Sequence, residues 1–154
     1  MARAREELRE LVAGNYPAIS RGLLGPLLQL LQVARDAFGG DLEKLLIMLV
    51  VAVRTAEHPD FQKYTPEQLM SGEVPVYPSL GTNIRSVADS IGAPKETVRR
   101  KIAELVEAGW LVRKTKALHF TTLAYRELDQ VRIAIERLAV TNFEIVRDLL
   151  RRIP

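Results

Sequence analysis

The chain has 154 residues, of which 47% are hydrophobic and 27% are charged, as in an ordinary globular domain. Extensive disorder is therefore excluded. Cysteine is absent and only two histidines occur, which excludes disulfides and every cysteine-ligated metal site. Aromatic residues make up only 6%, which argues against a strand-rich fold. We expect a mainly α-helical protein with neither a metal ion nor a cofactor.

The net charge of +3 is distributed unevenly. Residues 81–125 carry eight basic and four acidic side chains, whereas residues 41–80 carry three and six. A local basic excess is typical of proteins that bind nucleic acid, although a solvated helix face gives the same composition. The first residues mix both signs of charge and do not resemble a signal peptide. The longest apolar run, Leu45 to Val53, is too short for a membrane span, so we expect a cytoplasmic protein.

Residues 1–40 are expected to form an N-terminal helical segment. A short charged helix extends to about Val12, and residues 14–17 form a turn. A leucine-rich helix is predicted to start at residues 25–26, because proline suits the first turn of a helix. The two glycines at residues 39–40 end it.

Residues 41–124 are predicted to form one domain. Its first helix, residues 41–58, has Asp41 as a plausible N-cap and is apolar nearly all round, as in a helix at the centre of a core. Residues 59–81 contain four prolines and are expected to be a loop with one turn of helix near Thr65.

Two short helices joined by a tight turn follow this loop. The first begins after Asn83, a good N-cap, and is stopped by Gly92. The second runs over residues 94–108. Helices joined this closely must cross at a large angle, which is the helix-turn-helix arrangement.

A β-hairpin is expected directly after the second helix. Residues 109–113 lead into a strand, residues 114–117 form the tip, and residues 118–121 form the returning strand. Helix, turn, helix and hairpin in this order form a winged helix-turn-helix, with the wing at residues 113–119.

This region resembles bacterial winged-helix transcription regulators over residues 82–124. Its second helix is most similar to that of the catabolite-activator family, in Lys95-Glu96-Thr97-Val98, Arg100 and Gly109-Trp110-Leu111. The resemblance implies a sequence-specific DNA-binding regulator with residues 94–108 as the recognition helix. It does not imply control by a cyclic nucleotide, because no β-rich, glycine-punctuated segment precedes the motif. Ala93 and Pro94 also replace the usual hydroxyl cap.

The resemblance implies base contacts by Lys95, Glu96 and Arg100 and a backbone contact by Thr97. Helical geometry separately directs three of these four side chains, all except Lys95, away from the apolar stripe near the helix N-terminus, the end that enters the major groove. Arginine can bind guanine there, and glutamate can accept from cytosine.

Neighbouring cations are candidates for phosphate contacts. Arg99 and Lys101 flank the exposed helix face, and two wing lysines would reach the adjacent backbone. Arg85 is either structural or a phosphate contact. The predicted DNA-binding residues are Lys95, Glu96, Thr97, Arg99, Arg100, Lys101, Lys114 and Lys116.

Residues 125–154 are predicted to form a C-terminal helical dimerisation segment. Apolar residues recur at spacings of three and four from Leu128 to Leu149, a heptad seam that contains Asn142. Either this helix is continuous and pairs with a second chain, or it breaks near Asn142, where Thr141 and Glu144 form a capping-box pattern. A homodimer would suit a palindromic operator in double-stranded DNA. The alternative is a monomer whose terminal helices cover the helix of residues 41–58.

Two functions remain in competition. The basic segment and the wing lysines favour a DNA-binding transcription regulator, whereas Glu104 and Glu107 favour a winged-helix module for protein–protein assembly. An enzyme is not expected, because no nucleophile elbow, phosphate loop or metal-ligand cluster is present. The operator, the direction of regulation and any small-molecule effector are not specified by the sequence.

Overall fold

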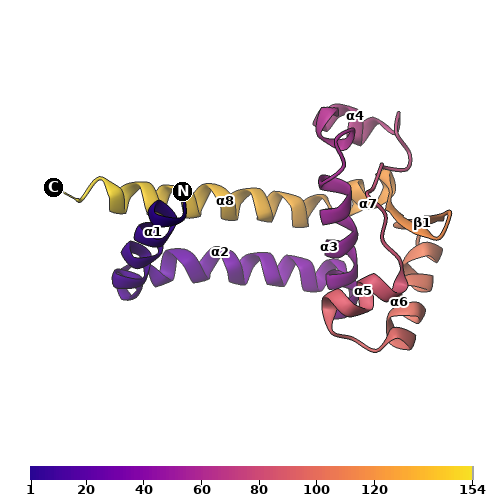
Figure 1. The fold of residues 1–154 in the computed structure, drawn as a ribbon, viewed down its shortest axis with the longest axis horizontal. Coiled ribbons are helices and arrows are strands. Elements are labelled where there is room, and N and C mark those ends of the chain that lie inside the picture. Colours follow the sequence, from indigo (N-terminus) through magenta and orange to yellow (C-terminus); the bar gives the residue numbers. More distant parts are fainter. Residues whose placement is uncertain (154) are drawn as a thin grey trace. The chain divides into compact units, whose positions relative to one another are not determined.

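The computed structural model describes residues 1–153 and is mainly helical, with one small two-stranded antiparallel sheet (Figure 1). The chain divides into two compact units. The terminal unit contains residues 1–34 and 130–153, and the central unit contains residues 35–129. Within the described residues, no helix combines the length and apolar character needed to cross a membrane.

The terminal unit is built from α1 (Ala2–Gly14) and most of α2 (Tyr16–Ala37) and α8 (Asp129–Leu150). The two long helices lie side by side and run in opposite directions (Figure 1). A Cβ atom added to Gly22 of α2 would lie 2.9 Å from Cδ1 of Ile145 on α8. The missing side chain therefore allows the two helices to approach closely at this point.

The leucine-rich helix starts earlier than the sequence predicts. α2 begins at Tyr16 and keeps Pro26 in its interior, so the prediction of a start at residues 25–26 is wrong. An internal proline removes one backbone hydrogen bond and normally breaks or kinks a helix. Apolar residues on both sides of Pro26 continue the packing surface, and tertiary packing supplies most of the stability of such helices.

The C-terminal helix is unbroken at Asn142. The break lies at Leu128, between α7 (Thr122–Glu127) and α8. Leu128, Val131 and Leu149 of the predicted seam are each less than 10% exposed within one chain. These positions are therefore not free to pair with a second chain, and burial inside the chain outweighs the capping pattern at Thr141.

The central unit is organised around α3 (Leu42–Ala56). Asp41 caps this helix, and its Oδ1 accepts a hydrogen bond from the backbone N–H of Lys44 at 3.0 Å. Ile47 and Val51 are fully buried, and α3 packs against α5 (Ile84–Ile91), α6 (Lys95–Glu107) and strand β2 (Ala117–Phe120). One side of α3 stays exposed at Leu42 and Val53, so the helix is not buried all round.

The elements predicted after residue 81 are present with small shifts. The side chain of Asn83 accepts a hydrogen bond from the N–H of Ser86, and Gly92 ends α5 with φ of 68°, a left-handed value that glycine adopts without strain. Strand β1 (Leu111–Lys114) pairs antiparallel with β2, with Leu111 opposite Phe120. The loop before α5 contains a 3-10 turn, η1 (Phe61–Lys63), and a capped helix, α4 (Pro66–Ser71).

Candidate nucleic-acid interface

A groove of about 270 Å³ opens on the central unit beside α5, α6 and the hairpin. Five of its lining residues are arginine or lysine and none is acidic. The lining residues are Asn83, Ile84, Arg85, Lys95, Arg99, Arg113, Lys116 and Leu118. Because charges of one sign around a concave surface reinforce one another, the groove attracts anions.

Two helix starts position three of these cations. Asn83 caps α5 through its Oδ1, 2.9 Å from the N–H of Ser86, which places Arg85 in the first turn. α6 begins at Lys95, and Arg99 follows four residues later on the same helix face. Helix N-termini carry partial positive charge, so both helix starts add to the attraction for anions.

The fourth cation of the groove, Arg113, is placed there by the alternation of side chains along β1. Leu111 is buried, and Arg113, two residues on, lies on the same face and lines the groove. Lys114 lies on the opposite face of the strand and is not part of the groove lining.

The hairpin turn supplies the fifth cation, Lys116. The turn contains only Thr115 and Lys116, whose φ values are 50° and 66°. Two positive φ values in a two-residue loop are those of a type I′ turn, whose twist matches the twist of paired strands. The predicted tip of residues 114–117 is therefore shorter in the structure, and Lys114 ends β1.

The exposed face of α6 beside the groove carries Glu96 and Arg100. Oε2 of Glu96 lies 3.4 Å from Nε of Arg99, and both side chains are more than half exposed, so this ion pair is loose and solvated. Thr97 is half-buried between this face and the core. These residues lie at the N-terminal end of α6, as expected, but outside the groove lining.

Lys101 points to a different neighbour. Its Nζ lies 2.8 Å from Oδ1 of Asp41 and 2.9 Å from Oε2 of Glu43, and its side chain is only 15% exposed. Hydrogen bonds to these two carboxylates raise the pKa of Lys101 above its ordinary value. Because its charge is already compensated, we exclude Lys101 from the candidate interface.

A third ion pair also joins the start of α3 to α6. Nζ of Lys44 on α3 lies 2.7 Å from Oε2 of Glu104 on α6, and this hydrogen bond lowers the pKa of Glu104. Burial alone would raise the pKa of Asp41, but hydrogen bonds from Lys101 and from the backbone of Lys44 outweigh it and lower that pKa. Glu104 is thus partly compensated inside the protein.

Of the eight predicted DNA-binding residues, the structure places some in the groove lining and others outside it. It brings Lys95, Arg99 and Lys116 into one groove and adds Arg113, which the sequence reasoning missed. The signal was available, because a period of two along residues 111–114 places Arg113 on the same face as buried Leu111. Arg85, left open between two roles, also lines the groove.

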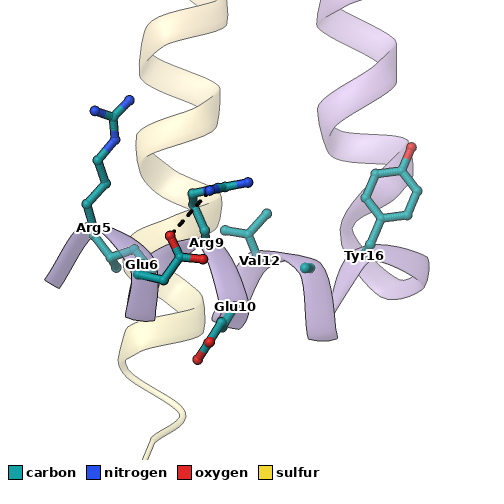
Figure 2. A pocket seen from close by; sticks show the side chains of 8 residues that line it. Arg5, Glu6, Arg9, Glu10, Val12 and Tyr16 are labelled. Carbon is teal, nitrogen blue, oxygen red and sulfur yellow. Dashed lines mark hydrogen bonds and ion pairs between the residues drawn. The ribbon is translucent and has the colours of Figure 1, made fainter. Parts of the chain in front are cut away.

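A larger hollow of about 580 Å³ follows α1 in the terminal unit (Figure 2). Arg9 reaches Glu6, with Nη1 and Oε2 3.3 Å apart, while Glu10 points the other way and Tyr16 stands at the start of α2 (Figure 2). Its exposed charges alternate in sign, so it lacks the single-sign character of the groove. Among residues 1–153, no group of three histidine, aspartate or glutamate residues could hold a metal ion.

Comparison of the chain with known proteins found no matching family model, no matching curated protein and no matching solved structure.

Proposed function

We propose that this protein is a DNA-binding transcription regulator whose central unit is a winged helix-turn-helix. In this proposal α5 and α6 are the two helices of the motif, α6 is the recognition helix, and the β1–β2 hairpin is the wing. The order of the elements supports it, as do the resemblance of residues 82–124 to bacterial winged-helix regulators and that of the second helix to the catabolite-activator family.

The observation that carries the proposal is the groove with five cations and no carboxylate. Its cations come from three separate elements, two helix starts and a hairpin. A duplex presents a line of phosphates, and basic side chains and helix N-termini are the groups that bind phosphate oxygens. The groove therefore suits the DNA backbone, with Lys116 on the proposed wing and Arg85 on the first helix.

Base reading is assigned to the exposed face beside the groove. Arg100 can donate two hydrogen bonds to guanine, and Glu96 can accept one from cytosine. Because Lys95 lines the groove, we assign it a phosphate contact in place of the base contact that the resemblance implies. Phosphate contacts by Lys95 and Arg99 would fix the register of α6 so that Arg100 and Glu96 meet base edges. Lys114 lies away from the groove, so we expect it to contribute less than Lys116.

The test compares two double variants of equal charge change. Lys95→Ala/Arg113→Ala removes two groove cations, and the control Arg3→Ala/Lys63→Ala removes two exposed cations elsewhere, with side chains 94% and 75% exposed. Affinity for a random-sequence duplex is measured at several salt concentrations. We expect the groove variant to lose about one unit of log-affinity versus log-salt slope per phosphate contact removed, about two per chain, while the control keeps the slope of the unmodified protein.

Two results would overturn the proposal. Absence of salt-dependent duplex binding by the unmodified protein would leave the groove without a role in DNA binding. Equal slopes for both double variants would show that the contacts lie elsewhere. In either case, assembly with an acidic protein partner would become the better account of the basic surface.

A further inference from the structure

Helix α2 has two apolar faces. One contains Gly22, Pro26, Leu30 and Val33, is half-buried, and meets α8 at Gly22. The other consists of Leu24, Leu27, Leu28 and Leu31, at the i, i+3, i+4, i+7 spacing of a single helix face. These four leucines are 40–58% exposed. An amphipathic surface helix has a polar face at this position, so α2 lacks a partner for its second face.

Helix α8 has the same property. Ile145 and Leu149 lie on the half-buried and buried side, while a second row of apolar residues is largely exposed. That row is Ile135, Ala139, Phe143, Val146 and Leu150, at spacings of four, four, three and four. Phe143 is the most exposed of them, at 65%.

The two rows fall on the same side of the helix pair. At about 100° per residue, the centre of the α8 row is rotated by roughly 100° from the side of Ile145 and Leu149. The centre of the α2 row is rotated by roughly 155° from the side of Gly22, in the same rotational sense along the chain, so it points further outward. Because α2 and α8 are antiparallel (Figure 1), equal senses of rotation direct both rows to one side. We call this two-helix surface the α2/α8 face; it consists of Leu24, Leu27, Leu28, Leu31, Ile135, Ala139, Phe143, Val146 and Leu150.

The area of this face matches what a stable dimer needs. The exposed fractions of its seven large hydrophobic side chains, valine aside, add up to about three and a half whole side chains, or roughly 500–700 Å² at about 150–200 Å² each. A typical interface buries about 800 Å² per partner, of which somewhat more than half is apolar. The face alone supplies that apolar part.

The interior of the terminal unit is correspondingly thin. Only four of its described hydrophobic residues are buried, against sixteen in the central unit. The four are Ala34, Val131, Ala134 and Leu149. α1 contributes no buried residue.

We infer that a second copy of this chain docks on the α2/α8 face, so that two terminal units form a four-helix arrangement. In a two-fold symmetric dimer, both copies contribute the same surface to the interface. The apolar α2/α8 face of one copy would therefore pack against the apolar α2/α8 face of the other. The nine residues of the face include no charge that would require a partner of opposite sign. This inference does not depend on DNA binding by the central unit.

The first test measures mass in solution. Sedimentation of the full chain at micromolar concentration should give twice the 17.3 kDa of one chain. Leu24→Glu/Leu28→Glu should give a monomer with unchanged helical circular dichroism. The control Leu42→Glu/Val53→Glu changes two residues of α3 that are 60% and 54% exposed, close to the 50% and 58% of the α2 pair, and should stay dimeric. A monomeric unmodified protein, or a dimer that the α2 variant leaves intact, would overturn the inference.

The second test needs no disruptive change. Because the chain lacks cysteine, single cysteines can be placed at Leu28 and Leu42, which are 58% and 60% exposed in one chain. At micromolar concentration, Leu28→Cys should react with a maleimide severalfold more slowly than Leu42→Cys, and dilution should abolish the difference. Equal rates at high concentration would show that the α2/α8 face stays open and that no second copy covers it.

Discussion

Lys95 and Lys101 lie six residues apart on α6 and have different surroundings. Lys95 lines a groove without carboxylates, while Lys101 is held between Asp41 and Glu43. The difference follows from helical geometry, because six residues turn the side chain by about 240°. One lysine is available to a ligand, and the other holds two helices together.

Thr115 is the residue whose conformation least suits its side chain. Its φ of 50° is in the left-handed region, which is unfavourable for a β-branched residue and accessible to asparagine. We expect Thr115→Asn to raise the free energy of unfolding by about 1 kcal/mol, measured by urea denaturation. Thr115→Val, which keeps the branched shape, serves as the control and should bring no gain. A stability loss in Thr115→Asn would show that the threonine side chain makes a contribution larger than the backbone strain.

At the scale of elements, three ion pairs join the start of α3 to α6. Lys101 bridges Asp41 and Glu43, and Lys44 binds Glu104. These contacts fix the helix that we propose to enter the major groove relative to the centre of the core. They also compensate the negative charges of three carboxylates near α6, which would otherwise repel phosphates.

The lowered pKa of Asp41 predicts an acid-dependent contribution to stability. A carboxyl group with a lowered folded-state pKa contributes fully above its unfolded pKa, near 4, and loses this contribution as the pH falls through the folded value. Asp41→Asn keeps an N-cap but not the charge, so we expect a loss of less than about 1 kcal/mol at pH 7. Urea denaturation measures the free energy of unfolding of the variant and of the unmodified protein. The difference between these two free energies should shrink as the pH falls from about 5 to about 2, because Asp41 becomes protonated near and below pH 4. A constant difference would contradict the role of the charge.

At the scale of the whole molecule, the two proposals make a joint prediction. If two chains associate through the α2/α8 face and each brings one cationic groove, the dimer contacts about twice as many phosphates as a monomer. The salt dependence of binding scales with that number. Dimerisation and DNA affinity should therefore change together.

We accordingly expect Leu24→Glu/Leu28→Glu to bind a duplex with about half the log-affinity versus log-salt slope of the unmodified protein. The control Leu42→Glu/Val53→Glu adds the same charge and should keep the full slope. Fluorescence anisotropy at several salt concentrations measures both. A full slope in a monomeric variant would mean that one chain makes all the phosphate contacts.

The sequence by itself predicted the mainly helical fold with a small hairpin, because helical spacing, N-caps such as Asn83 and stop signals such as Gly92 act locally. It also pointed to the basic segment that contains the groove. Arg113 could have been added to the predicted DNA-binding residues, because the alternation of side chains along its strand places it on the same face as buried Leu111.

Only the tertiary structure decided which charges are free and which helix signals prevail. Lys101 is compensated by residues sixty positions away, and this pairing depends on how α6 packs on α3. Pro26 and Thr141 carry local signals for helix ends, yet both lie inside continuous helices. Packing along a whole helix outweighs a single proline or cap, and only the folded chain shows which faces are buried. The exposed leucine row of α2 became visible for the same reason.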